Sequence, residues 1–153
     1  MAIASVLTNS FKTELLKGLH SFDTSGATPA GSVFKIALYN SSASLGTTTT
    51  AYTTSNELAT ATGYTRPGNT LTNTGVGVST VTSFTDFSDT SWTSASFTAR
   101  GCLIYNSSTI TGLTTDAAVC WIDFCGAKTV SSGTFTIQFP TNDSSSAIIR
   151  ITS

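Results

Sequence analysis

The side chains able to act as acids, bases or nucleophiles are few and scattered along this 153-residue chain. His20 is its only histidine, and no Gly-x-Ser-x-Gly segment offers a nucleophile to work with it. His20 lies near the end of a predicted helix, where the helix dipole favours a protonated side chain. Zinc sites use Cys, His or carboxylate ligands in close-spaced pairs, a pattern that this sequence lacks. We therefore expect no catalytic residue, no metal ligand and no cofactor.

The carboxylates are eight in number, and two of them placed across a cleft would be enough for a glycosidase. Asp123 stands out because apolar residues flank it in a predicted buried strand, and we expect it to pair with Arg100 or Arg150 from another strand. Asp86 and Asp89 bracket a predicted turn, where capping and turn hydrogen bonds are expected instead of calcium ligation. These structural roles indicate a protein that is not an enzyme.

The three cysteines, Cys102, Cys120 and Cys125, all fall in predicted strands. Cys120 and Cys125 are five positions apart, so on one straight strand their side chains point to opposite faces and do not share a metal. We expect all three to be buried free thiols that pack as small apolar side chains.

Charge is scarce, with seven basic and eight acidic side chains and a net charge of −1. Such a chain has no electric field that would attract nucleic acid or an anionic membrane surface, so neither is expected as a partner. A chain with so little charge also repels other copies of itself only weakly, which suits a protein that works in an assembly. The N-terminus lacks the basic region of a signal peptide, and we expect synthesis and folding in a reducing cytosol.

Two dense apolar stretches, 97–105 and 118–125, are predicted as the central strands of an all-β domain. Phe135, Ile137 and Phe139 alternate with polar residues, which predicts a sheet exposed on one face. About seven or eight short strands separated by turn residues predict an antiparallel, jelly-roll-like β-sandwich. We expect one domain over residues 1–153, with an N-terminal arm and helix over 1–22 and the sandwich over 33–151.

The predicted N-terminal helix spans residues 9–22 and carries an apolar stripe. Phe11, Leu15 and Leu19 follow one another at intervals of four residues, so they share one face of the helix. The stripe has two interpretations. It packs over an open end of its own sandwich, or it docks against a neighbouring subunit.

Two further aromatic residues are candidates for a contact surface. Tyr52 lies in a Ser-, Thr- and Ala-rich segment, 40–56, that we predict to be a long exposed loop, and Trp92 follows a predicted turn. Loops of this length in a compact domain are often contact surfaces. The candidate interface residues are thus Phe11, Leu15, Leu19, Tyr52 and Trp92.

Several segments together resemble a family of small virion proteins of tailed bacteriophages, whose members are described as structural, head decoration, tail or fibre proteins. The resemblance covers nearly the whole chain and implies no active-site residues. The segments that carry it are FKTELLKGLHSF at 11–22, FKIALY at 34–39, GY at 63–64 with GNTL at 68–71, ARGCLIYN at 99–106, and FTIQFP at 135–140 through AIIRI at 147–151.

Within that family we expect a capsid decoration (cement) protein, located in the virion after synthesis in the host cytoplasm. Its expected partners are the major capsid protein and copies of itself, in a homo-oligomer. Two alternatives remain open: a neck, tail or fibre component, and a carbohydrate- or receptor-binding sandwich that uses Tyr52, Tyr64 or Trp92 against sugar faces.

Overall fold

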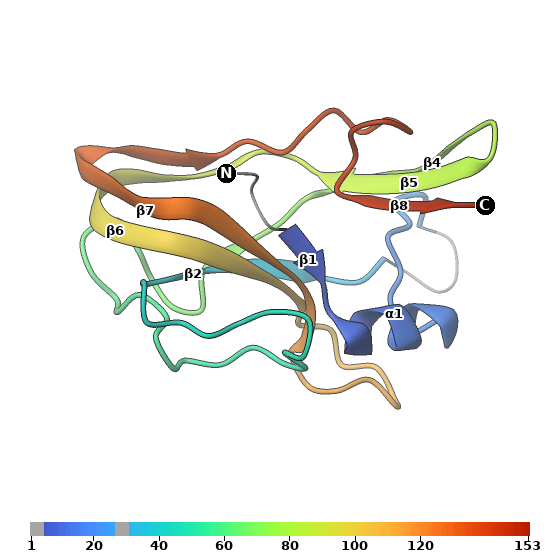
Figure 1. Cartoon of the computed structure of the whole chain (residues 1–153), viewed down its shortest axis with the longest axis horizontal. Coiled ribbons are helices and arrows are strands. Elements are labelled where there is room, and N and C mark those ends of the chain that lie inside the picture. The colour runs from blue at the N-terminus through green and yellow to red at the C-terminus, as the bar shows by residue number, and fades with distance from the viewer. Residues whose placement is uncertain (1–4, 27–30) are drawn as a thin grey trace.

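The chain folds into an antiparallel β-sandwich with a short helix near its N-terminus (Figure 1). The computed structural model describes residues 5–26 and 31–153, and within them one sheet has five strands, in the order β1-β7-β6-β2-β3, and the other three, in the order β4-β5-β8. The all-β sandwich that was predicted is confirmed. Its elements are β1 Ser5–Leu7, α1 Asn9–Leu16, β2 Phe34–Tyr39, β3 Asn69–Thr70, β4 Asn73–Ser79, β5 Thr82–Phe87, β6 Thr90–Asn106, β7 Ala117–Ile137 and β8 Ile149–Thr152.

The two dense apolar stretches, 97–105 and 118–125, lie in the middle of the larger sheet, as predicted. They belong to β6 and β7, which pair antiparallel with Leu103 opposite Trp121. β6 has 17 residues and β7 has 21. β7 is this long because the alternating residues 134–137 continue it and do not form a strand of their own. Register shifts interrupt the pairing, and bulges of this kind let the long pair bend, as Figure 1 shows.

The core between the two sheets is rich in aromatic rings. Phe34, Ile36 and Leu38 of β2 are all fully buried in it. Phe22 stacks on Phe34 with ring centroids 4.5 Å apart, and Phe87 meets Phe34 edge-on at 5.4 Å. Ring contacts of this kind add to the stabilisation from buried apolar area. They join the segment after α1, the larger sheet and the smaller sheet into one core.

The outer face of the larger sheet is covered as well, which was not predicted. Ala37 and Tyr39 of β2 are buried there. The cover comes from the loop 40–56, in which Tyr52 stacks on Tyr105 with ring centroids 4.7 Å apart. The continuous apolar character of the central strands follows from this burial on both faces.

The helix α1 is shorter than the predicted one over 9–22. Thr8 caps its start, accepting a hydrogen bond from the backbone N–H of Phe11. Gly18, with φ +71°, follows its end, and glycine adopts this left-handed conformation without steric cost. Phe11 is fully buried in the core between the sheets, so this part of the apolar stripe packs against the chain's own sandwich.

Candidate functional site

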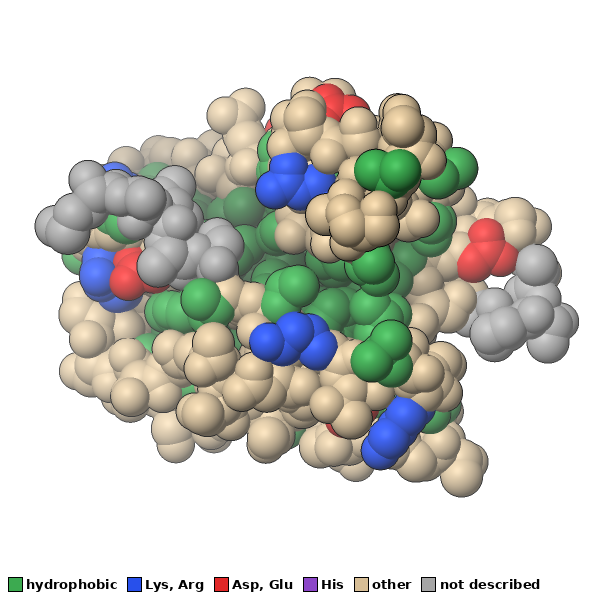
Figure 2. Space-filling view, turned by 45° about the vertical axis from the view of Figure 1, so that its right-hand side comes forward, with side chains coloured by type: hydrophobic (Ala, Val, Ile, Leu, Met, Phe, Trp, Pro, Cys, Tyr) green, Lys and Arg blue, Asp and Glu red, His purple; other side chains and the backbone are tan. Residues whose placement is uncertain are grey.

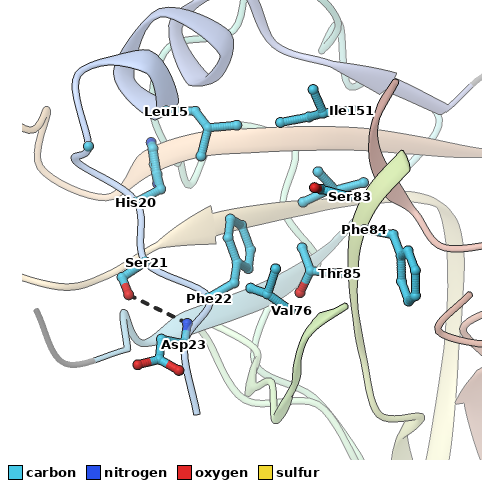
Figure 3. Close-up of a pocket in the computed structure, with 12 residues that line it drawn as sticks. Leu15, His20, Ser21, Phe22, Asp23, Val76, Ser83, Phe84, Thr85 and Ile151 are labelled. Atoms are coloured by element: carbon cyan, nitrogen blue, oxygen red, sulfur yellow. Dashed lines mark hydrogen bonds between the residues drawn. The ribbon is translucent and has the colours of Figure 1, made fainter. Parts of the chain in front are cut away.

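An open cleft of about 330 Å³ lies between α1 and the smaller sheet. Figure 3 shows Leu15 of α1 and Ile151 of β8 at the same cleft as Phe22 and Val76. Its walls are mainly apolar. The cleft is therefore suited to an apolar partner surface more than to a charged or polar small molecule.

The smaller sheet contributes a face that is buried at one end and exposed at the other. In one row across the sheet Thr85 pairs with Ile149 and both are buried, while Val76 of the edge strand β4, on the other side of Thr85, is exposed. In the next row towards the hairpin tip Val78 and Ile151 both lie opposite Ser83, and both are exposed. Residues two positions apart on a strand point to the same face. The core-facing side of this sheet thus continues beyond the core into solvent.

His20 lies at the cleft but is buried. The Nδ2–H of Asn106 donates to its Nδ1 at 3.0 Å, and the amide orientation is fixed because the Asn106 Oδ1 accepts from the backbone N–H of Ser108. The ring proton therefore sits on Nε2, which donates to the Glu14 carboxylate at 3.1 Å. Burial lowers the pKa of His20, and Glu14 opposes that shift only in part. The ring links α1 to β6, since both of its nitrogens have partners.

A second polar cluster, missed at the level of sequence, surrounds the buried carboxylate of Glu57. The hydroxyls of Tyr52 and Tyr64 donate to it at 2.6 and 2.7 Å, and the Arg66 Nε lies 3.3 Å away. Arg66 also donates to the backbone carbonyl of Glu57 at 2.7 Å. Burial, together with the nearby carboxylate, raises the pKa of both tyrosines well above the usual range. The cluster holds the loop over the outer face of the larger sheet.

The carboxylates singled out from sequence have structural partners. Asp123 forms the predicted ion pair, with its Oδ2 2.9 Å from the Arg100 guanidinium, and both side chains are partly exposed. Asp86 and Asp89 accept hydrogen bonds at 3.0 and 2.8 Å from backbone N–H groups in the segment 139–148, so they fasten the C-terminal part of the chain. Among residues 5–26 and 31–153, no group of three or more His, Cys, Asp or Glu side chains is placed to hold a metal ion.

Two of the three cysteines are buried as predicted, and Cys125 is not. Cys102 and Cys120 are buried between the sheets, whereas Cys125 is half-buried farther along β7. Burial raises the pKa of Cys102, and it raises the pKa of Cys120 to about 12. These two thiols stay protonated at neutral pH and pack as apolar side chains.

The candidate interface residues are not brought together by the fold. Phe11 and Trp92 are buried in the core between the sheets, which corrects their assignment as surface anchors. Large aromatic side chains contribute most to a core, and the sandwich uses them there. Leu15 lines the cleft and Leu19 is half-buried, while Tyr52 belongs to the cover over the other face of the larger sheet.

In the described part of the chain no helix is both long and apolar enough to cross a membrane. Comparison of the chain with models of protein families, with curated proteins and with solved structures finds no match. The apolar cleft and the exposed end of the smaller sheet are the candidate interaction surface.

Proposed function

We propose that this chain is a non-enzymatic structural protein of a tailed-bacteriophage virion, specifically a decoration (cement) protein on the outer surface of the head. In this role it binds the major capsid protein and neighbouring copies of itself, and it stabilises the contacts between capsomers. The resemblance of the sequence segments described above supports the virion class. The exposed surface of the fold supports an assembly role.

The observation that carries the proposal is the apolar surface around the cleft. This surface continues the apolar face of the core, and none of the described residues covers it. Contiguous exposed apolar patches on soluble proteins mark sites of interaction with another protein. The large exposed apolar side chains of this surface come from the β4–β5 hairpin and β8. Val76, 63% exposed, and Ile151, 57%, line the cleft, and Val78, 74%, lies with Ile151 on the same face of the sheet, opposite Ser83.

The low charge of the chain supports the same role. Charged residues make up 10% of the sequence and the net charge is −1, so copies approach one another without strong repulsion. A decoration protein touches several subunits at once, and modest contacts become strong in combination. An uncharged, partly apolar surface is suited to such repeated contacts.

The fold gives less support to carbohydrate binding. Tyr64 and Trp92 are buried, and the hydroxyl of Tyr52 donates to Glu57. An aromatic ring stacks on a sugar only when one of its faces is exposed. Tyr64 and Trp92 therefore offer no exposed ring face, and Tyr52 has at most one, because the other face of its ring stacks on Tyr105.

Binding to purified mature heads tests the proposal. We expect wild-type protein to bind heads in numbers proportional to the major capsid protein, and Ile151→Asp to lose binding because a carboxylate is desolvated at the contact. Thr134→Asp adds the same charge on an exposed position of β7 and is expected to bind like wild type. Thermal unfolding checks that both variants are folded. A small fixed copy number would place the protein in the neck or tail, and absence of head binding by wild type would contradict the proposal.

A further inference from the structure

A second hollow lies where β7 bends, apart from the cleft beside α1, and has a volume of about 790 Å³. Both halves of β7 and the segment leading into β8 form its walls. Figure 2 shows that hydrophobic side chains are exposed in a hollowed region on one face of the molecule. We call the hollow at the bend of β7 the β7–β8 groove. The large apolar side chains that line it and are only partly buried are Ile122, Phe124, Phe135, Ile137, Phe139 and Ile148.

The groove is a part of the core between the sheets that stays open. Its apolar side chains pack against the core but are only partly buried. Phe124 and Phe135, from the two halves of β7, approach each other with ring centroids 6.1 Å apart. In the described part of the chain no strand lies across them, since β8, which borders the groove, has four residues and ends the smaller sheet.

The strand β8 offers backbone hydrogen bonds to a further strand. Among the described residues it pairs with β5 alone, so the backbone groups on its other edge have no strand partner. An exposed edge strand presents unpaired N–H and C=O groups to which an extended segment can add, and proline at the edge would prevent this. Ile149–Thr152 meets this description, with Arg150 as its charged residue.

The charges at the groove select the partner. Lys128 and Arg150 line it, and none of the described residues that line it is acidic. Neither side chain forms an ion pair within the described part of the chain, although Arg150 donates to the backbone carbonyl of Ser145. Two unpaired cations beside an apolar floor are complementary to a segment that carries both apolar side chains and carboxylates.

A second copy of this chain is a poorer occupant. Antiparallel pairing of β8 with β8 of another copy is symmetric, so it brings the two Arg150 side chains close together on the same face. Like charges opposite each other on paired strands are destabilising. A different protein with an acidic extended segment avoids this repulsion.

We propose that the β7–β8 groove binds an extended segment of another protein in which apolar side chains alternate with Asp or Glu. The segment adds to the free edge of β8, its apolar side chains fill the space over Phe124 and Phe135, and its carboxylates pair with Lys128 and Arg150. This site goes beyond the proposed function, because it is a different surface from the cleft beside α1 and binds without a virion.

Binding of short labelled peptides to the purified full-length protein tests the inference. The probe is a capped peptide in which Val alternates with Thr and Glu, and the matched control peptide carries Gln in place of Glu. We expect the Glu peptide to bind more tightly than the Gln peptide. The double variant Lys128→Glu, Arg150→Glu should bind it more weakly by a factor on the order of ten, and should prefer a peptide with Lys in place of Glu. Lys35→Glu, on β2 outside the groove, should bind as wild type does.

Backbone hydrogen exchange locates the bound peptide, since strand addition protects the amides of 149–152. Equal binding of the Glu and Gln peptides, unchanged binding after charge reversal, or protection confined to other strands would each overturn the inference. So would the absence of any peptide binding. If the charge-reversed protein does not fold, the double variant Lys128→Gln, Arg150→Gln gives the same comparison. None of these outcomes affects the copy number on heads, so a failure here is distinct from a failure of the proposed virion role.

Discussion

The core around β2 and the hairpin end of the smaller sheet use the same kinds of side chain in opposite surroundings. Phe34 and Ile36 are fully buried between the sheets, whereas Val78 and Ile151 are largely exposed. Aromatic and β-branched residues favour strands in both regions. The regions differ in what covers them, because the smaller sheet and the segment after α1 face β2, while among the described residues nothing covers the hairpin end.

This difference has an energetic meaning. Fully burying a valine or isoleucine side chain stabilises a structure by about 1.5–3 kcal/mol. In the folded monomer this free energy is realised at Ile36 but largely not at Val78 and Ile151. A partner that buried Val78 and Ile151 would therefore gain stabilisation that the folded monomer lacks. The core offers no such gain, because it is already buried.

The largest effect is expected in the core. Phe34→Ala removes a ring that contacts Phe22 and Phe87, and large-to-small changes of this kind cost about 3–5 kcal/mol in the free energy of unfolding. Urea denaturation measures it. The adjacent exposed residue provides a control, because Val33→Ala should change stability by less than about 1 kcal/mol. Similar losses in both variants would contradict the contrast between covered and uncovered positions.

The sequence was sufficient for much of the covered region. Continuous apolar runs located the cores of β6 and β7, because a buried strand needs apolar side chains at those positions. The same patterns did not show that 118–125 and 134–137 belong to one bent strand, since bulges depend on the pairing partner. Helix length was also overestimated, because Gly18 interrupts an otherwise regular stripe.

The polar clusters could not be predicted from the sequence. Glu57 lies in a Ser- and Thr-rich loop without periodicity, and its partners Tyr52 and Tyr64 become adjacent only after the loop folds over the larger sheet. Trp92 was taken for a surface anchor for a related reason, since a single aromatic residue after a turn gives no pattern that reveals burial. The open cleft likewise depends on where the sheets end, which local patterns do not encode.

A smaller effect is expected where the core meets the cleft, at His20. Burial lowers the pKa of His20 below its ordinary value of about 6.5, so the unfolded chain takes up a proton first as the pH falls. The stability linked to this residue is therefore fully present above about pH 6.5 and is lost as the pH falls below it. Denaturation at pH 7 and at lower pH, in protein that retains Glu14 and Asn106, measures how the free energy of unfolding changes with pH.

The variant His20→Gln serves as the control for this pH dependence, because it lacks the titrating ring. Asp86 acts in the opposite direction: burial raises its pKa, so the folded chain takes up that proton first and stability gains as the pH falls. This opposing contribution persists in the variant. An identical loss of stability on acidification in wild type and in His20→Gln would show that another group is responsible.

The smallest effect is expected at the hairpin end, where the same substitution can be compared in both regions. Val78→Thr should change the stability of the monomer by no more than about 0.5 kcal/mol, because the new hydroxyl is exposed to water. Val119→Thr places the same hydroxyl in the fully buried core and should cost about 1–3 kcal/mol. A large, concentration-dependent cost at Val78 would mean that copies of the chain already cover this face in solution, and sedimentation of the two variants would then separate self-association from binding to a different partner.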